Sequence, residues 1–205
     1  MNRNAEIIRN TLKTYKEKRD AADAKVARIR EEYGEEASKK ELDRQNNFLK
    51  ASRAAAESAI RAAAGEEQKN AIAWGKLDGS KLTDDIKLLD SGLVDVEAFN
   101  GLKEKYQDNA TMLSALRKYA DKQNAAAAKE AHEKGNHFAM IEPFETRDIP
   151  TAEDKSKKWE RAQASAFNML DAMDRVGKYG NPRDWGAQMM VNALPGQIEH
   201  FGEDL

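Results

Sequence analysis

Apolar side chains recur at alternating spacings of four and three residues through the first third of the chain. The first run consists of Ile8, Leu12, Tyr15, Ala22, Val26, Ile29 and Tyr33, and Arg19 occupies one position of the same series. Residues at this spacing form one stripe on an α-helix, and a stripe sustained over about three and a half heptads is typical of a coiled coil. The residues between them are mostly charged, which suits a solvated helix face.

A second and weaker run follows Gly34. It consists of Leu42, Asn46, Leu49, Arg53, Ala56, Ile60 and Ala63. Because the step from Tyr33 to Leu42 does not continue the first register, two arrangements are open. Either Gly34 ends the first helix and the chain turns back as a helical hairpin, or one long helix continues through an irregularity in the repeat. An interior glycine costs a helix only about 1 kcal/mol, so both arrangements fit the pattern.

Small and polar residues fill many positions of this stripe, so it is too weak to form a stable coiled coil by itself. We expect it to be covered either by the C-terminal part of the same chain or by a second chain, and we favour the second chain. The predicted oligomerisation seam then consists of Ile8, Leu12, Tyr15, Ala22, Val26, Ile29, Tyr33, Leu42, Leu49 and Ile60.

Residues 81–124 carry the pattern of three short helices that form a small bundle. The helices are predicted to begin near Thr83, Asp95 and Asn109, because these residue types accept hydrogen bonds from the first N–H groups of a helix. The predicted core consists of Leu82, Ile86, Leu89, Leu93, Phe99, Leu102, Tyr106, Met112, Leu113, Leu116 and Tyr119. A bundle this small is only marginally stable by itself, so it is expected to pack against the coiled coil.

The last part of the chain is predicted to be a pair of helices with a tail, over residues 151–205. Thr151 and Asp154 have the form of a capping box, and Pro195 with Gly196 is expected to end the second helix. Trp and Met side chains concentrate here, as they do on adaptable binding faces and in helical cores. The candidates for partner binding are Trp159, Phe167, Leu170, Met173, Trp185, Met189 and Met190.

These segments together predict an all-α fold. Residues 1–74 form a coiled coil or long helical hairpin, residues 81–124 a three-helix module and residues 151–205 a C-terminal helical pair. Residues 125–150 form an irregular linker whose first ten residues can extend the third helix of the module. Two prolines in this linker hold the residues before them in extended conformation.

Charge and composition narrow the class of protein. The chain has 205 residues, 34 of them basic and 36 acidic, and no cysteine. Disulfides, thiolate metal sites and cysteine nucleophiles are thereby excluded. Residues 1–64 carry a net charge of +4, residues 65–130 a net −2 and residues 131–205 a net −4. This balance argues against a uniformly basic nucleic-acid binder and leaves room for attraction between the basic coil and the acidic end, within or between chains.

The chain shows no targeting or membrane-spanning segment. No apolar run of signal-peptide length follows the N-terminus, and no stretch approaches the ~20 apolar residues of a membrane span. We therefore expect a cytoplasmic protein that does not contact a membrane.

Motifs for catalysis, metal binding or cofactor binding do not occur. His132 and His137 stand five residues apart around Glu133, whereas a zinc-binding helix needs two histidines four residues apart. The acidic stretch from Asp78 places Gly79 at the second position of a calcium loop, where the sixth is required. Glycine-rich phosphate loops are also missing. We expect neither an enzyme nor a cofactor.

Three short helices also raise the possibility of a helix-turn-helix module that binds DNA. Residues 109–124 would be its recognition helix, with Arg117, Lys118 and Lys122 as the basic side chains. The net charge of residues 65–130 has the wrong sign for phosphate binding, so a structural bundle without nucleic acid is expected. A nucleic-acid-associated or regulatory helical adaptor is the alternative function.

The order of these parts resembles that of a known class of proteins. A break with the sequence YGEEA at residues 33–37 precedes the helical stretches LTDDIKLL at residues 82–89 and NATMLSAL at residues 109–116. Together they resemble small, mostly helical virion-assembly proteins of tailed phages of Gram-positive bacteria, some of which act like capsid scaffolding proteins. The resemblance implies a non-enzymatic homo-oligomer that contacts a structural partner such as a capsid protein, in the host cytoplasm or in the virion. Scaffolding proteins often end in a basic helical hook, and the acidic residues 131–205 depart from that pattern.

Overall fold

The computed structural model describes residues 2–136, 143–179, 185–203 and 205. Its elements are α1 (Arg3–Trp74), the short 3₁₀ helix η1 (Gly79–Lys81), α2 (Ile86–Ser91), α3 (Val96–Lys105), α4 (Ala110–Glu133), α5 (Ala152–Tyr179) and α6 (Trp185–Glu199). These ranges contain no β-strand, which confirms the predicted all-α class. The chain forms two compact units: residues 1–69 with residues 156–205 make the first unit, and residues 70–155 make the second.

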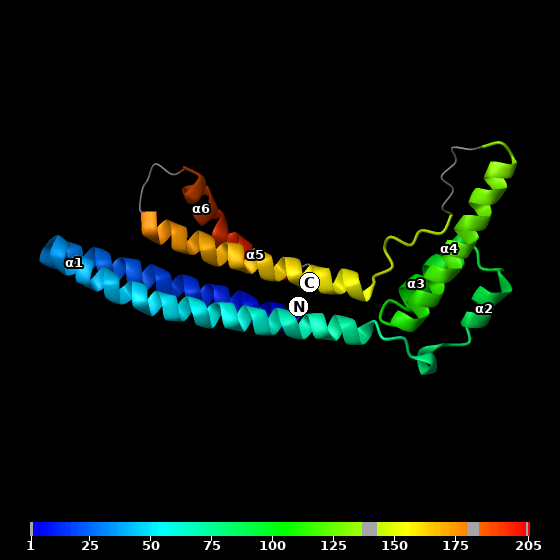
Figure 1. Cartoon of the computed structure of the whole chain (residues 1–205), viewed down its shortest axis with the longest axis horizontal. Helices are drawn as coiled ribbons and strands as arrows, with labels where there is room; N and C mark the ends of the chain where they lie inside the picture. Colours follow the sequence, from blue (N-terminus) through cyan, green and yellow to red (C-terminus); the bar gives the residue numbers. More distant parts are fainter. Residues whose placement is uncertain (1, 137–142, 180–184, 204) are drawn as a thin grey trace. The chain divides into compact units, whose positions relative to one another are not determined.

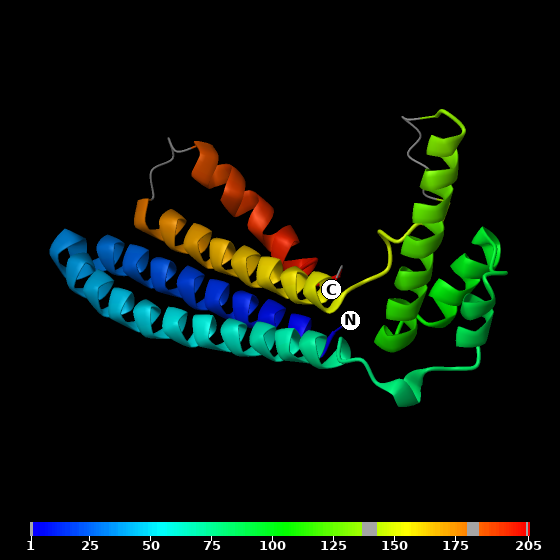
Figure 2. The same cartoon turned by 45° about the vertical axis from the view of Figure 1, so that its right-hand side comes forward.

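α1 is a helical hairpin. Its backbone leaves the helical conformation at Gly34 (φ 83°, ψ −176°), in a region that is open essentially only to glycine. The arms run antiparallel, because Asn4 Nδ2 donates to Glu67 Oε1 at 2.7 Å and Lys25 Nζ lies 2.7 Å from Glu41 Oε1. Both views show the arms side by side (Figures 1 and 2). Of the two arrangements that the sequence left open, the hairpin is therefore the correct one.

The core of the first unit lies between the hairpin, α5 and α6. α1 contributes Ala5, Ile8, Leu12, Tyr15, Ala56, Ile60, Ala63 and Ala64; α5 contributes Trp159, Ala162, Ala166, Met169, Leu170, Ala172 and Met173; and the C-terminal end contributes Leu194, Ile198 and Phe201. The alanines on α1 leave room for close approach of the helices. The C-terminal part of the same chain thus covers a large part of the predicted oligomerisation seam.

α6 continues through Pro195, whereas the sequence predicted that it would stop there. The extra turn carries Ile198, and both Ile198 and Phe201 just beyond the helix are buried in the core of the first unit. A proline inside a helix costs about 3 kcal/mol. Burying two large apolar side chains contributes about 3 to 6 kcal/mol. The free energy gained by packing these side chains in the core therefore offsets the tendency of Pro195 to end the helix.

The second unit is a helical bundle in which α3 and α4 begin at the predicted caps. α2 begins at Ile86, and Asp85 before it makes no side-chain cap hydrogen bond. Asp95 Oδ1 accepts a hydrogen bond from Ala98 N at 2.8 Å, and Asn109 Oδ1 accepts one from Met112 N at 3.2 Å. α4 runs to Glu133, through the residues that the sequence allowed to extend the third helix. The buried core consists of Leu89, Val94, Phe99, Leu102, Tyr106, Met112, Leu113, Leu116, Tyr119, Ala120, Phe144 and Ile149.

Two predicted core residues of this unit are exposed. Leu82 and Leu93 both face solvent, and Ile86 is only half-buried. The core is completed instead by Phe144 and Ile149, which lie in the segment predicted to be an irregular linker. The linker lacks helical periodicity, so the pattern on which the core prediction rested could not include them.

Phe144 is held in place by ring contacts and by its own backbone. Its ring meets those of Phe99 and Tyr119 edge-on, with centroid distances of 5.2 and 5.5 Å. The side chain of Asn124 brackets its peptide groups, accepting from Phe144 N at 3.0 Å and donating to Phe144 O at 2.9 Å. The segment that carries Phe144 therefore packs as part of the second unit.

Candidate functional site

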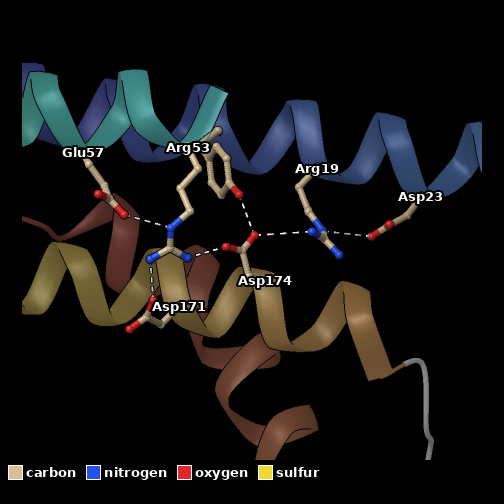
Figure 3. A network of polar contacts seen from close by, with 7 residues as sticks. Arg19, Asp23, Arg53, Glu57, Asp171 and Asp174 are labelled. Carbon is tan, nitrogen blue, oxygen red and sulfur yellow. Dashed lines mark hydrogen bonds and ion pairs between the residues drawn. The ribbon is translucent and has the colours of Figure 1, made fainter. Parts of the chain in front are cut away.

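A polar cluster inside the first unit joins α5 to both arms of α1 (Figure 3). Asp174 Oδ1 accepts a hydrogen bond from Tyr15 Oη at 2.5 Å and lies 3.3 Å from Arg19 Nη1. The other oxygen, Asp174 Oδ2, accepts a hydrogen bond from Arg53 Nη1. Arg19 and Arg53 are the charged exceptions in the two apolar runs, so the cluster explains why cations occupy seam positions.

Further carboxylates surround the two arginines. Arg53 Nη2 donates to Asp171 Oδ1 at 2.5 Å, and Arg53 Nε donates to Glu57 Oε1 at 2.9 Å. On the first arm, Arg19 Nε lies 3.5 Å from Asp23 Oδ2. Each guanidinium therefore bridges its own helix to α5. Such an arrangement fixes the sliding position of α5 along the hairpin, because a shift by one turn would separate both arginines from Asp171 and Asp174.

The pKa values of Tyr15 and Arg53 are both shifted in the direction that keeps their hydrogen bonds to the carboxylates. Burial raises the pKa of the Tyr15 hydroxyl, and the hydrogen bond to Asp174 and the negative charge of that carboxylate raise it further. Burial lowers the pKa of the Arg53 guanidinium, but hydrogen bonds to its three carboxylate partners outweigh burial, so its pKa is raised. Tyr15 stays protonated as a donor and Arg53 stays charged. The groups are engaged with one another, which suits a clamp between helices rather than a reacting centre.

Sequence reasoning named the arginines but missed their partners on α5. The two arginines themselves indicated such partners, because a buried arginine in an otherwise apolar stripe needs an acidic side chain opposite it. Asp171 and Asp174 stand three residues apart, so they share one helix face.

The end of the hairpin is built differently from its base. We call residues 26–48 the hairpin end; in both views the turn extends past the C-terminal end of α5 at Tyr179 (Figures 1 and 2). Tyr33 is 71% exposed and Leu42 is 41% exposed. Leu42 stands seven residues before the buried Leu49, so it continues the same stripe beyond the part that α5 covers.

The predicted seam is thus split between a buried and an exposed part. Ile8, Leu12, Tyr15, Ala22, Leu49 and Ile60 are buried. Val26 and Ile29 are half-buried, and Tyr33 and Leu42 are exposed. The exposed part remains free to meet a second chain, whereas a second chain would reach the buried part only by displacing contacts within the chain.

The predicted partner-binding residues are also divided. Trp159, Leu170 and Met173 are buried in the core of the first unit. Phe167 packs against that core, with the Arg61 guanidinium 4.8 Å from its ring centroid. Met189 is exposed, and the side chains of Trp185 and Met190 lie outside the described residues. A role in partner binding stays a prediction for Met189.

A shallow groove runs between α5 and α6. It has a volume of about 460 Å³ and is lined by Ser165, Asn168, Met169, Ala172, Leu194, Gln197 and Phe201. This lining carries no formal charge, so it offers no group for acid–base chemistry or metal binding. It suits an apolar or neutral segment.

The helix considered for DNA recognition uses one of its cations inside the second unit. Arg117 Nη2 donates to Ile149 O at 2.5 Å and so holds the segment that completes the core. Lys118 and Lys122 are exposed. Of the three cations of the predicted recognition helix, only Lys118 and Lys122 therefore remain at the surface.

Metal and membrane sites are not found in the part of the chain that the structure describes. No group of three or more His, Asp or Glu side chains there is placed to hold a metal ion. His137, half of the histidine pair considered above, lies outside the described residues. None of the helices, within those same limits, has the length and apolar character needed to cross a membrane.

Comparison with known proteins supplies no relative. No family model, no curated protein and no solved structure matches this chain.

Proposed function

We propose that this protein is a non-enzymatic helical assembly protein that associates with itself through the hairpin end and binds a structural protein partner. The observation that carries the proposal is the exposure of Tyr33 and Leu42 on a stripe whose other half is buried. Large apolar side chains gathered at one end of an extended element are typical of interaction sites.

The two parts of the hairpin seam are proposed to have different roles, because α5 and α6 bury the base and leave Tyr33 and Leu42 exposed. The base, with Ile8, Leu12 and Ile60, makes the stable fold of one chain. The hairpin end has no such cover in the described part of the chain, and a second chain would supply the missing apolar contact. Association of this kind leaves the fold of each copy intact.

The nature of the partner follows from the resemblance to virion-assembly proteins. A capsid or other structural protein in the host cytoplasm or in the virion is the proposed partner. Met189 on α6 is one candidate contact, because an exposed methionine adapts to varied surfaces, and the uncharged groove between α5 and α6 is a second.

The test is the mass of the protein in solution over a wide concentration series. We expect the wild-type chain to form dimers or larger oligomers in multi-angle light scattering and sedimentation equilibrium, and the double variant Tyr33→Ser, Leu42→Ser to be monomeric. Ile72→Ser is the matched control, because Ile72 is an exposed apolar residue of α1 outside the hairpin end. A wild-type chain that stays monomeric throughout contradicts the proposal.

A further inference from the structure

The face of the hairpin that packs on α5 continues into the hairpin end. Tyr33 stands eighteen residues after Tyr15, which is five helical turns, so both lie on one stripe of the first arm. On the second arm, Leu49 lines a small cavity with Tyr15 and Asp174, and Leu42 stands seven residues before it. Tyr15 and Leu49 are buried, whereas Tyr33 is 71% exposed and Leu42 is 41% exposed. The exposed side chains therefore belong to a face that is already built to pack against helices.

Charged side chains of both signs stay unpaired at the hairpin end. Residues 26–48 carry six acidic and five basic side chains. Three of the basic side chains are engaged within the hairpin: Arg28 with Glu32, Arg30 with Glu35 and Arg44 with Glu41. The exposed charges without an ion-pair partner in the described residues are Glu31, Glu36, Lys39, Lys40 and Asp43. A surface with unpaired charges of both signs suits a copy of itself better than a strongly acidic or strongly basic partner.

Lys39 and Asp43 stand on either side of Leu42 along the second arm. Lys39 comes three residues before Leu42 and Asp43 directly after it, so the three side chains lie within about 100° of one another around the helix axis. Lys39 and Asp43 are four residues apart, yet they form no ion pair with each other in the described part of the chain. A lysine placed before its acid is the less favourable order for a pair within one helix. Both charges therefore remain free to meet another chain.

A two-fold axis next to Leu42 would match these two charges with each other. In an antiparallel pair of identical helices, a residue ahead of the axis lies opposite a residue behind it on the other copy. Lys39 of each copy then faces Asp43 of the other, and the two Leu42 side chains meet at the centre. The acids nearest the turn, Glu31 and Glu36, come within about one helical turn of the level of Lys50 of the other copy. Lys50 is exposed and unpaired among the residues that the structure describes.

We propose that the hairpin ends of two copies of this chain pack antiparallel about a two-fold axis next to Leu42. Tyr33 and Leu42 of the two copies are buried where α5 no longer covers the hairpin, and Lys39 of each copy pairs with Asp43 of the other. The four arms form a short four-helix bundle. This inference rests on the proposed self-association and names its receiving surface and its symmetry. Because both copies use the same surface, the contact closes at two chains.

Exchanging the two charges tests the pairing. Lys39→Glu and Asp43→Lys each create two contacts between like charges, so each variant alone should dimerise about tenfold more weakly than wild type. An equimolar mixture of the two variants should regain the affinity of wild type, because one carries two acids and the other two lysines at these positions. Sedimentation velocity at physiological salt, with one variant fluorescently labelled, measures each equilibrium.

Lys40→Glu is the matched control for the charge variants. It makes the same change in net charge at an exposed and unpaired neighbour of Lys39. Lys40 lies about 100° further around the helix, away from Leu42, so its reversal should leave the affinity unchanged. Equal weakening by Lys40→Glu and Lys39→Glu would overturn the inference.

A single introduced thiol tests the symmetry, because the chain has no cysteine of its own. Leu42→Cys treated with a short bismaleimide should give a crosslinked dimer, since the axis brings residue 42 of both copies together. A contact between two different surfaces would keep the two copies of this residue apart. Ile72→Cys, at an exposed apolar position of α1 outside the hairpin end, is the control and should remain uncrosslinked.

The outcomes separate this inference from the proposed function. If wild type associates but neither charge variant weakens it, or if the variants stay weak on mixing, the inference is overturned and self-association through the hairpin end stands. No crosslink at position 42, equal crosslinking at position 72, or growth of wild type beyond two chains also overturns it. A wild-type chain that is monomeric throughout overturns the proposed function itself. All substituted positions are exposed, and circular dichroism with thermal unfolding checks that each variant is folded.

Discussion

The two halves of the hairpin seam have the same residue spacing and different surroundings. At the base, Leu12 and Ile60 are fully buried under α5 and α6. At the hairpin end, Tyr33 and Leu42 continue the stripe and face solvent. The difference shows that periodicity defines which face of a helix is apolar, whereas the position of α5 decides how much of that face is covered.

The polar side chains in the two halves follow the same division. At the base, Arg19 and Arg53 reach across to Asp174 on another helix. Near the end, Glu41 is engaged by Lys25 of the opposite arm and by Gln45 of its own arm, at 2.7 and 2.6 Å. The base is therefore held by polar contacts between α5 and both arms of the hairpin, whereas the polar contacts of Glu41 near the end, in the described part of the chain, lie within the hairpin.

The largest expected difference between the halves is in the cost of truncating a seam leucine. Leu12→Ala should lower the free energy of unfolding by about 2 to 5 kcal/mol, because it leaves a cavity in a packed core. Leu42→Ala should cost under ~1 kcal/mol, because its side chain is partly solvated. Urea denaturation followed by circular dichroism measures both at a concentration where the chain is monomeric. Equal costs would show that the halves are equally packed.

Removing the charge at the centre of the polar cluster should affect the base strongly. Asp174→Asn should lower the free energy of unfolding by about 2 kcal/mol, because hydrogen bonds from Tyr15 and two arginines lose their charged acceptor. Asp20→Asn is the control, since Asp20 pairs with Lys16 of the same arm and its side chain is largely exposed. The control should cost under ~0.5 kcal/mol. If both variants unfold at the same urea concentration, the cluster does not clamp α5.

The turn that creates the hairpin end depends on one glycine. Gly34→Ala should lower the free energy of unfolding by about 1 to 2 kcal/mol, because a Cβ is strained at φ 83°. Gly65→Ala should raise it by about 0.5 to 1 kcal/mol, because Gly65 lies inside a helix with no atom within 4 Å of the added Cβ. Thermal unfolding of the pair gives opposite shifts in Tm. Shifts of the same sign would contradict a sharp turn at Gly34.

The smallest expected effect is a pH dependence at the hairpin end. Hydrogen bonds from Lys25 and from Gln45 lower the pKa of the Glu41 carboxyl. Its folded pKa lies below its unfolded pKa, so it stabilises the fold above the unfolded value and this contribution is lost as the pH falls through the folded value. Wild type should therefore lose more stability than Glu41→Gln between about pH 6 and pH 3.

Urea titrations across this range measure the difference. Glu31→Gln is the control, because Glu31 is exposed and has no ion-pair partner in the described residues; its pH profile should follow wild type. If wild type and Glu41→Gln lose stability in parallel as the pH falls, the Lys25–Glu41 contact does not stabilise the hairpin end.

Much of the fold follows from local sequence signals. The heptad spacing marks the arms of the hairpin, and the caps at Asp95, Asn109 and Thr151 mark helix starts where the structure has them. The tertiary contacts of irregular segments do not follow. Phe144 and Ile149 belong to no periodic pattern, so their place in the core could not be predicted, and the exposed Leu93 could not be distinguished from a core leucine.

The candidate surfaces show the same limit. Sequence spacing predicted the apolar stripe on each arm of the hairpin but not which of its residues a second chain could reach. It named Trp159, Leu170 and Met173 for a binding face, and these side chains lie in the core instead. An amphipathic helix shows one apolar face, and the same face serves a core or an interface equally well.

By itself, the sequence determined the all-α class, the two runs of heptads, the break at Gly34 and the uneven charge along the chain. Only the tertiary structure decided that α5 covers the base of the hairpin, that Asp174 pairs with the two seam arginines, and that Tyr33, Leu42 and Leu93 stay exposed. The physical reason is the distance along the sequence over which each interaction acts. Helix formation and capping depend on residues within one or two turns, whereas burial depends on which distant segment packs on each face.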